Sequence, residues 1–139
     1  MLHVLVHMGV SDQRVTSVTI AKMLGTSPPA VRRTMGSLRE HGIVSSEDGK
    51  NGGWRLRKEL RDLTVLDVQR ALQNGPLLTK PPFQDHPDDG IETSAYRVVA
   101  AAYEAAESEL KDAFEAVRLS DIALDSVRQS EPRRGITSR

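Results

Sequence analysis

Residues 16–56, TSVTIAKMLGTSPPAVRRTMGSLREHGIVSSEDGKNGGWRL, decide the fold of this chain. Thr16 or Ser17 can accept hydrogen bonds from the first free amides of a helix, and Gly25 stands where helices commonly turn into the left-handed conformation. The pattern therefore predicts a first helix between these residues. Its apolar side chains recur at helical spacing and predict an inner face of Val18, Ala21 and Leu24.

A second helix is expected directly after a tight turn. Thr26 or Ser27 can cap it, and Pro28 takes the first helical position, where its missing amide hydrogen costs nothing. We expect the helix to stop at Gly42. Its apolar residues fall on one stripe, which consists of Val31, Met35 and Leu38.

A short hairpin with a glycine-rich tip completes the stretch. We expect a strand over 43–46, a turn-rich tip over 47–53 and a return strand over 54–56, with Trp54 in the core. The hairpin is basic, because it contains or adjoins Lys50, Arg55, Arg57 and Lys58. Two helices joined by a turn and followed by a hairpin are the plan of a winged helix-turn-helix, which reads duplex DNA.

The outer face of the second helix predicts contacts with a major groove. Arginine can bond guanine bidentately, and small side chains let the backbone approach the bases. Cations beside flexible glycines suit phosphates or a minor groove. The alternatives are an ordinary solvated helix face and a hairpin whose glycines only permit the turn. The predicted DNA-binding residues are Thr26, Ser27, Pro29, Ala30, Arg32, Arg33, Ser37, Arg39, Lys50, Asn51, Gly52 and Arg55.

Four motifs in this order resemble the Rrf superfamily of bacterial winged-helix regulators, which includes IscR, NsrR and CymR. They are Ile20-Ala21, the run LREHGIV over 38–44, the run GGWRL over 52–56 after Gly49, and the run LTVLDV over 63–68. The resemblance covers about residues 2–75 by motif and extends to about residue 128 by architecture. It implies a homodimeric transcription factor, usually a repressor, with the second helix in the major groove and the wing in the adjacent minor groove.

Several members of that family bind an iron–sulfur cluster through three cysteines, but this chain contains no cysteine. Thiolates are the ligands of such clusters and the reactive species of thiol switches. Composition therefore excludes cysteine-ligated cluster sensing and thiol switching, and we expect no cofactor. The chain resembles the cysteine-free branch of the family.

The rest of the chain predicts a mainly α protein in four parts. We expect a winged-helix unit over 1–75, a proline-rich acidic linker over 76–92, a dimerisation helix with a short terminal helix over 93–130, and a disordered tail over 131–139. Within the first unit we expect an opening helix over 1–9, with Leu2, Leu5, Val6 and Met8 inward, and another helix over 62–73. Thr64 and Asp67 predict a capping box in that second helix.

A long alanine-rich helix, from Thr93 or Ser94 to about Leu119, supplies the predicted dimer interface. Small residues at steps of four and three let two such helices approach closely, although one side of the helix could pack on its own domain. Glu107 falls on the opposite, charged face. We expect Ser120 to cap the last helix. The predicted seam consists of Ala95, Val99, Ala102, Ala106, Leu110, Ala113, Phe114 and Val117.

Two groups of residues contain possible metal ligands, but no metal site is predicted. His3 and His7 lie one helical turn apart, but two histidines are too few for a site. His86 has carboxylates beside it at spacings that fit no defined site, so an acidic solvated loop is the simpler interpretation. Those carboxylates are Asp85, Asp88, Asp89 and Glu92.

Charge and composition favour a nucleic-acid-binding protein over an enzyme. The net charge is zero, yet residues 1–60 hold nine Lys or Arg against five Asp or Glu, and residues 61–139 hold ten against fourteen. No apolar run is long enough for a membrane helix, no nucleophile–base pair or phosphate loop is recognisable, and we expect a cytoplasmic protein. The function predicted is a homodimeric repressor on a near-palindromic operator; the alternatives are a winged-helix protein-interaction module and a metal- or small-ligand-responsive regulator using loop 76–92.

Overall fold

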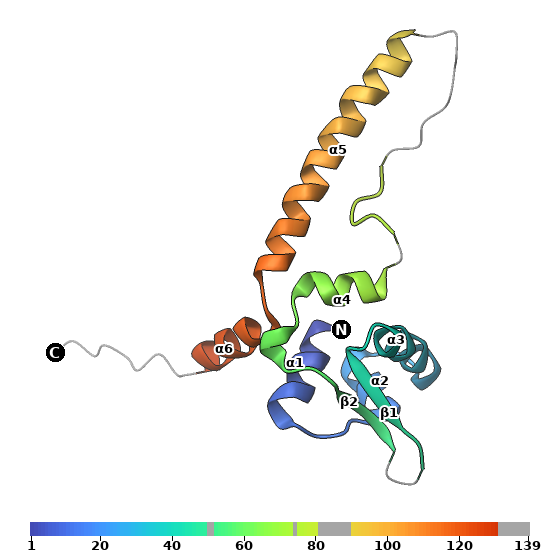
Figure 1. Cartoon of the computed structure of the whole chain (residues 1–139). Coiled ribbons are helices and arrows are strands. Elements are labelled where there is room, and N and C mark those ends of the chain that lie inside the picture. Colours follow the sequence, from blue (N-terminus) through green and yellow to red (C-terminus); the bar gives the residue numbers. More distant parts are fainter. Residues whose placement is uncertain (50–51, 74, 81–89, 131–139) are drawn as a thin grey trace, which may run out of the picture.

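The structure is a computed structural model that describes residues 1–49, 52–73, 75–80 and 90–130. It is mainly helical, with one two-stranded antiparallel sheet among the described residues (Figure 1). The elements are α1 (Leu2–Ser11), α2 (Ser17–Leu24), α3 (Pro28–Glu40), β1 (Val44–Glu47), β2 (Gly53–Leu56), the 3-10 turn η1 (Leu60–Asp62), α4 (Val65–Leu72), α5 (Gly90–Ala116) and α6 (Leu119–Ser130).

The helix pair α2–α3 is built by the caps that the sequence predicted. The Thr16 hydroxyl accepts a hydrogen bond from the Thr19 amide at 3.1 Å, and Gly25 closes α2 in the left-handed conformation with φ 64°. Ser27 caps α3 by accepting from the Ala30 amide at 3.4 Å. The tight turn between these caps fixes how α3 leaves α2, and the two helices contact each other.

The wing is the hairpin β1–β2, with Val44 paired to Leu56 and Glu47 paired to Gly53. Each strand lies within one residue of its predicted range. Trp54 is buried, as expected, and its indole N–H donates to the Ser17 hydroxyl at 2.9 Å. Two backbone hydrogen bonds between Val15 and Trp54 also tie the wing to the start of α2.

One apolar core joins the helix pair, the wing, α1, α4 and the start of α6. The predicted stripe of α3 is confirmed, with Met35 and Leu38 fully buried. The predicted inner face of α2 is wrong at Val18, which is 53% exposed, because the helix turns Ile20 inward instead. In α1 and α4 the buried Val4 and Val68 were not predicted.

The capping box that opens α4 is confirmed. The Asp67 amide donates to the Thr64 hydroxyl at 3.1 Å, and the Thr64 amide donates to the Asp67 carboxylate at 2.9 Å. The single helix expected over 62–73 is instead the turn η1 followed by α4, since Leu63 and Thr64 adopt extended backbone.

The long helix α5 is present, with shifted ends. It begins at Gly90 and ends at Ala116, whereas we expected 93 or 94 to about 119. Val117 therefore lies beyond its end, and its carbonyl accepts from the Val65 amide at 2.9 Å. The predicted cap of α6 at Ser120 is also wrong, because α6 already begins at Leu119, and the Asp121 carboxylate accepts from the Arg118 amide just before it at 2.9 Å.

Candidate nucleic-acid interface

The outer face of α3 presents two exposed arginines, Arg32 and Arg33. Neither makes an ion pair with another residue in the described parts of the chain. Pro29 beside them is exposed and Ala30 is half-buried. Since the buried stripe of α3 fixes the rotation of the helix, its cationic face is held toward solvent before any ligand arrives.

The turn before α3 holds Thr26 and Ser27, both of which are exposed. The Ser27 hydroxyl is already engaged as the helix cap. Its position at the helix N-terminus places backbone amides and the positive end of the helix dipole at this edge of the protein.

Two other predicted contacts on α3 have structural partners. The Arg39 guanidinium donates to the Ser46 hydroxyl at 3.0 Å and so links the end of α3 to β1. The Ser37 hydroxyl donates to the Ala71 carbonyl of α4 and is half-buried. The structure therefore places Ser37 in an interior contact, whereas the sequence put it on the outer face.

A groove of about 250 Å³ separates α3 from the wing. Arg32 lines one side of it, and the wing tip residues Gly49 and Gly52 line the other. Gly49 has φ 105°, and a Cβ atom on Gly52 would lie 2.4 Å from the Glu47 carbonyl oxygen. The tip therefore needs both glycines for its backbone path. Of the predicted contacts here, Lys50 and Asn51 lie outside the described residues.

Ion pairs fasten the wing to the region that follows α1. Arg14 pairs with Glu47 of β1 at 2.6 Å, and Arg55 of β2 pairs with Asp12 at 3.1 Å. Asp12 ends α1 in the left-handed conformation, with φ 46°. Arg55 was predicted as a DNA contact, and it also ties β2 to Asp12, at the end of the wing opposite its tip, which we call the wing base. Sequence reasoning missed Asp12 and Arg14, because nothing in the local pattern indicates their partners on the wing.

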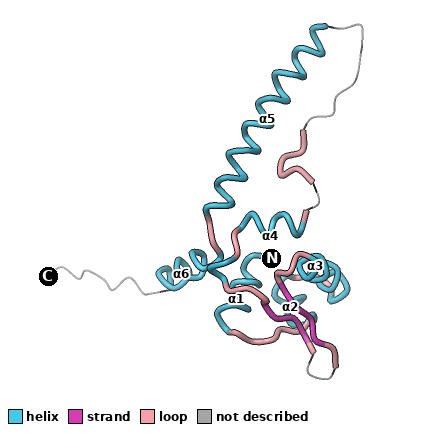
Figure 2. Tube along the Cα trace, in the orientation of Figure 1, coloured by secondary structure: helices cyan, strands magenta, loops and turns pink. Residues whose placement is uncertain are grey.

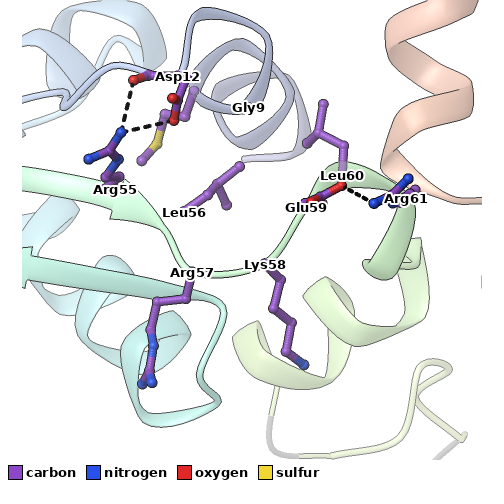
Figure 3. Close-up of a pocket in the computed structure, with 10 residues that line it drawn as sticks. Gly9, Asp12, Arg55, Leu56, Arg57, Lys58, Glu59, Leu60 and Arg61 are labelled. Carbon is purple, nitrogen blue, oxygen red and sulfur yellow. Dashed lines mark hydrogen bonds and ion pairs between the residues drawn. The ribbon is translucent and has the colours of Figure 1, made fainter.

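A cavity of about 540 Å³ lies at the wing base, between the end of α1 and residues 55–61 (Figure 3). Figure 3 shows Arg55 reaching toward Asp12, while Arg57 and Lys58 extend away from that pair. Arg61 is paired with Glu59 at 2.8 Å. Both carboxylates at this cavity are thus neutralised by neighbouring arginines, and Arg57 and Lys58 form no ion pair with any described residue.

The face of α5 predicted as a dimer seam is open in the single chain. Ala95, Ala102, Ala106 and Ala113 are exposed, and Val99 is 42% exposed. Leu110 and Phe114 are half-buried, and Val117 lies past the helix end. Val98, an apolar residue of α5 that the prediction omitted, is also 71% exposed.

Glu107, on the charged face of α5, is buried and not exposed as expected. Glu107 is only 8% exposed, although the sequence indicated a solvated position. It accepts a hydrogen bond from the Leu77 amide at 3.1 Å. The segment after α4 covers it, and no periodicity within α5 could have indicated that cover.

Neither of the two groups of possible metal ligands forms a metal site in the described part of the chain. His3 and His7 are exposed on α1, and no three His, Asp or Glu side chains among the described residues are grouped to hold a metal. His86, Asp85, Asp88 and Asp89 lie outside those residues. A cysteine-ligated iron–sulfur cluster does not fit this chain, which offers no thiolate.

Comparison with known proteins agrees with the architecture. YffB of Lactococcus lactis, named as an HTH-type transcriptional regulator, is 36% identical over 62 residues, which are 45% of this chain and 40% of YffB. The alignment thus spans less than half of that relative. A solved structure from Lactobacillus plantarum, described as a transcriptional regulator, aligns with TM-score 0.75 at 20% identity over 91% of this chain and 86% of that one. IscR of T. potens aligns with TM-score 0.66 at 22% identity over 96% and 85%.

The two solved structures show the shared fold, the winged helix-turn-helix with its long C-terminal helix. Within the described residues, no helix has the length and apolar character needed to cross a membrane. The model of the Rrf2 family, described as "Iron-dependent Transcriptional regulator", matches residues 1–125. The match covers most of the chain, and the protein therefore belongs to the Rrf2 family of transcriptional regulators.

Proposed function

We propose that this protein is a sequence-specific DNA-binding regulator that acts as a homodimeric repressor. The observation that carries the proposal is the exposed arginine pair of α3, Arg32 and Arg33, of which Arg32 lines a groove shared with the glycine-tipped wing. Arginines on an exposed helix suit base edges in a major groove, and a narrow hairpin suits the adjacent minor groove.

The contacts divide into two kinds in this proposal. Arg32 and Arg33 read bases, since their guanidinium groups form no ion pair with any described residue that would have to be broken first. Arg57 and Lys58 at the wing base, together with the α3 N-terminus, bind phosphates, which supply affinity without sequence information. Neutralisation of Glu47 and Asp12 by arginines removes two negative charges that would otherwise repel the DNA.

The apolar face of α5 joins two copies in the proposed dimer. The alanines of that face and Val99 are exposed, and α5 itself runs away from α3 (Figure 1). Twofold symmetry then presents two α3 helices to half-sites about one DNA turn apart, roughly 34 Å, on a near-palindromic operator. The dimer bound at this operator then blocks the promoter and so represses transcription.

Fluorescence anisotropy tests the proposal. The duplexes are DNA from upstream of the protein's own gene and a scrambled duplex of equal composition, titrated from about 50 to 300 mM salt. We expect a preference for the upstream duplex and a steep fall of affinity with salt. Equal, salt-insensitive binding to both duplexes, repeated with a genome-wide selection of bound fragments that recovers no shared sequence, would overturn it.

A further inference from the structure

A buried carboxylate on α5 has no part in the DNA-reading surface. Glu107 is only 8% exposed, and no other acidic side chain among the described residues is buried. Other acidic side chains of the same helix, such as Glu109 and Asp112, are exposed. Burying an ionised carboxylate is unfavourable unless hydrogen bonds and a counter-charge compensate for it, so its partners indicate what it does.

The partners of Glu107 come from two places. Its carboxylate accepts from the Leu77 backbone amide at 3.1 Å and pairs with Lys111, one turn further along α5, at 3.1 Å. The bond from Lys111 and the bond from the Leu77 amide hold the pKa of Glu107 below its usual value. One turn before Glu107, Glu104 pairs with Lys80 at 2.7 Å. Two successive turns of α5, at Glu104 and Glu107, are thus bonded to segment 77–80.

Segment 77–80 follows α4, and α4 lies against the recognition helix. The Ser37 hydroxyl of α3 donates to the Ala71 carbonyl near the end of α4, so the two helices are joined close to that segment. α3 is therefore bonded to α4, and segment 77–80, which follows α4 in the chain, is bonded to Glu107 and Glu104 on α5. Figures 1 and 2 show the same order of elements, with α4 between α3 and the base of α5.

A second set of bonds, or joint, holds the C-terminal end of α5, in addition to the joint at Glu104 and Glu107. The Val65 amide donates to the Val117 carbonyl and the Leu119 amide donates to the Leu63 carbonyl, both at 2.9 Å. This joint lies ten residues from Glu107, which is about 15 Å along a helix. A single joint would leave α5 free to pivot, whereas two joints separated by that distance fix its direction relative to α3.

We call the α5 residues Glu104, Glu107 and Lys111, with their bonds to segment 77–80, the clamp; it and the alanine stripe of the predicted dimer seam occupy different faces of α5. At 100° per residue, Glu104, Glu107 and Lys111 centre roughly 130° around the helix from the stripe that includes Ala102 and Ala106. The helix can therefore hold its own DNA-binding unit on one face while a partner packs on the other.

We propose that Glu107 is a positioning residue for DNA binding, which fastens the exit of α4 to α5 and so sets the spacing at which two α3 helices meet the operator. This inference rests on the proposed function, because it assumes a dimer joined through α5. A rigid dimer binds best where the half-sites match its own geometry, and a looser dimer adapts to several spacings.

The test measures spacing preference instead of affinity alone. Operators are made with the half-sites moved by one base pair either way, which shifts a half-site by about 3.4 Å and rotates it by about 35°. For the wild-type dimer we expect about tenfold weaker binding to the shifted operators. For Glu107→Ala we expect this ratio to fall to about twofold, with affinity for a single half-site unchanged within about twofold.

Two further variants make the readout specific to the clamp. Glu107→Gln keeps an oxygen that can accept from the Leu77 amide, and we expect it to recover most of the spacing preference. Asp112→Ala is the matched control, since Asp112 is exposed on the same helix and makes no ion pair in the described parts of the chain. Hydrogen exchange of the Leu77 amide, which needs no DNA, should be faster in Glu107→Ala than in wild type.

The outcomes separate this inference from the proposed function. A wild-type protein with no preference among the operators and the scrambled duplex would overturn both. A wild-type preference that Glu107→Ala retains in full, or equal losses on half-sites and full operators, would overturn the positioning role alone. Unchanged Leu77 exchange in Glu107→Ala would also overturn it, whatever the DNA shows.

Discussion

At the scale of single residues, Arg33 and Lys58 should separate two kinds of DNA contact. Both side chains are exposed, but one stands on the outer face of α3 and the other at the wing base. We expect Arg33→Ala to weaken operator binding by roughly 1–3 kcal/mol and to affect scrambled DNA much less. Lys58→Ala should weaken both duplexes alike and lower the salt slope by about one. Anisotropy titrations measure both quantities; equal losses on both duplexes for Arg33→Ala would contradict its role in base reading.

The Glu107 carboxylate should make stability depend on acidic pH. Its pKa is lowered in the folded protein from the usual 4.5, first by the bond from Lys111 and then by the Leu77 amide. A carboxylate with a lowered folded pKa stabilises the protein above the unfolded pKa, and this contribution is lost as pH falls through the folded pKa. Thermal unfolding between about pH 6 and 3 should therefore show a steeper fall of Tm for wild type than for Glu107→Gln. Parallel curves would contradict the shift.

At the scale of elements, the wing depends on one buried side chain. Trp54 fills the space between β2 and α2 and donates its indole hydrogen to Ser17. Trp54→Ala should lower the free energy of unfolding by roughly 3–5 kcal/mol, and Trp54→Phe, which loses the hydrogen bond but keeps a ring, by less. Urea unfolding measures both changes. Val18→Ala, on the exposed face of α2, is the control and should change stability by under about 0.5 kcal/mol.

The helix caps and the element order could be predicted from the sequence because their signals are local. Thr16, Ser27 and the Thr64–Asp67 box each bond within three residues, so neighbouring letters reveal them. The inner face of α2 could not be fixed in this way. Spacing allows a stripe through Val18 or one through Ile20, and only the position of its neighbours in the fold decides between them.

Contacts between distant segments escaped prediction for the same reason. Asp12 meets Arg55 over 43 positions in the sequence, and Leu77 meets Glu107 over 30. Both acidic residues sit in surroundings that look solvated when they are taken as sequence alone. The exposure of Arg32 and Arg33 on the outer face of α3 was predictable from the helix pattern, whereas the ion pairs that orient the wing and the arm required the structure.

At the scale of the whole molecule, α5 should determine both assembly and operator affinity. Ala106 lies in the middle of the predicted seam and is exposed in the single chain. A glutamate there would bring two like charges together at the twofold axis, in a contact that needs small apolar residues. We therefore expect Ala106→Glu to convert the proposed dimer to a monomer, as measured by light scattering on a sizing column.

Ala101→Glu makes the same chemical change on another face of α5, because position 101 is turned roughly 140° away from the middle of the seam. It is exposed as well, so it should leave the dimer intact. Loss of the dimer in Ala106→Glu should abolish the gain from two half-sites, so that the full operator binds about as weakly as a single half-site. A monomeric Ala106→Glu with undiminished operator affinity would show that each chain reads DNA alone, and then the angle between α5 and α3 would have no bearing on half-site spacing.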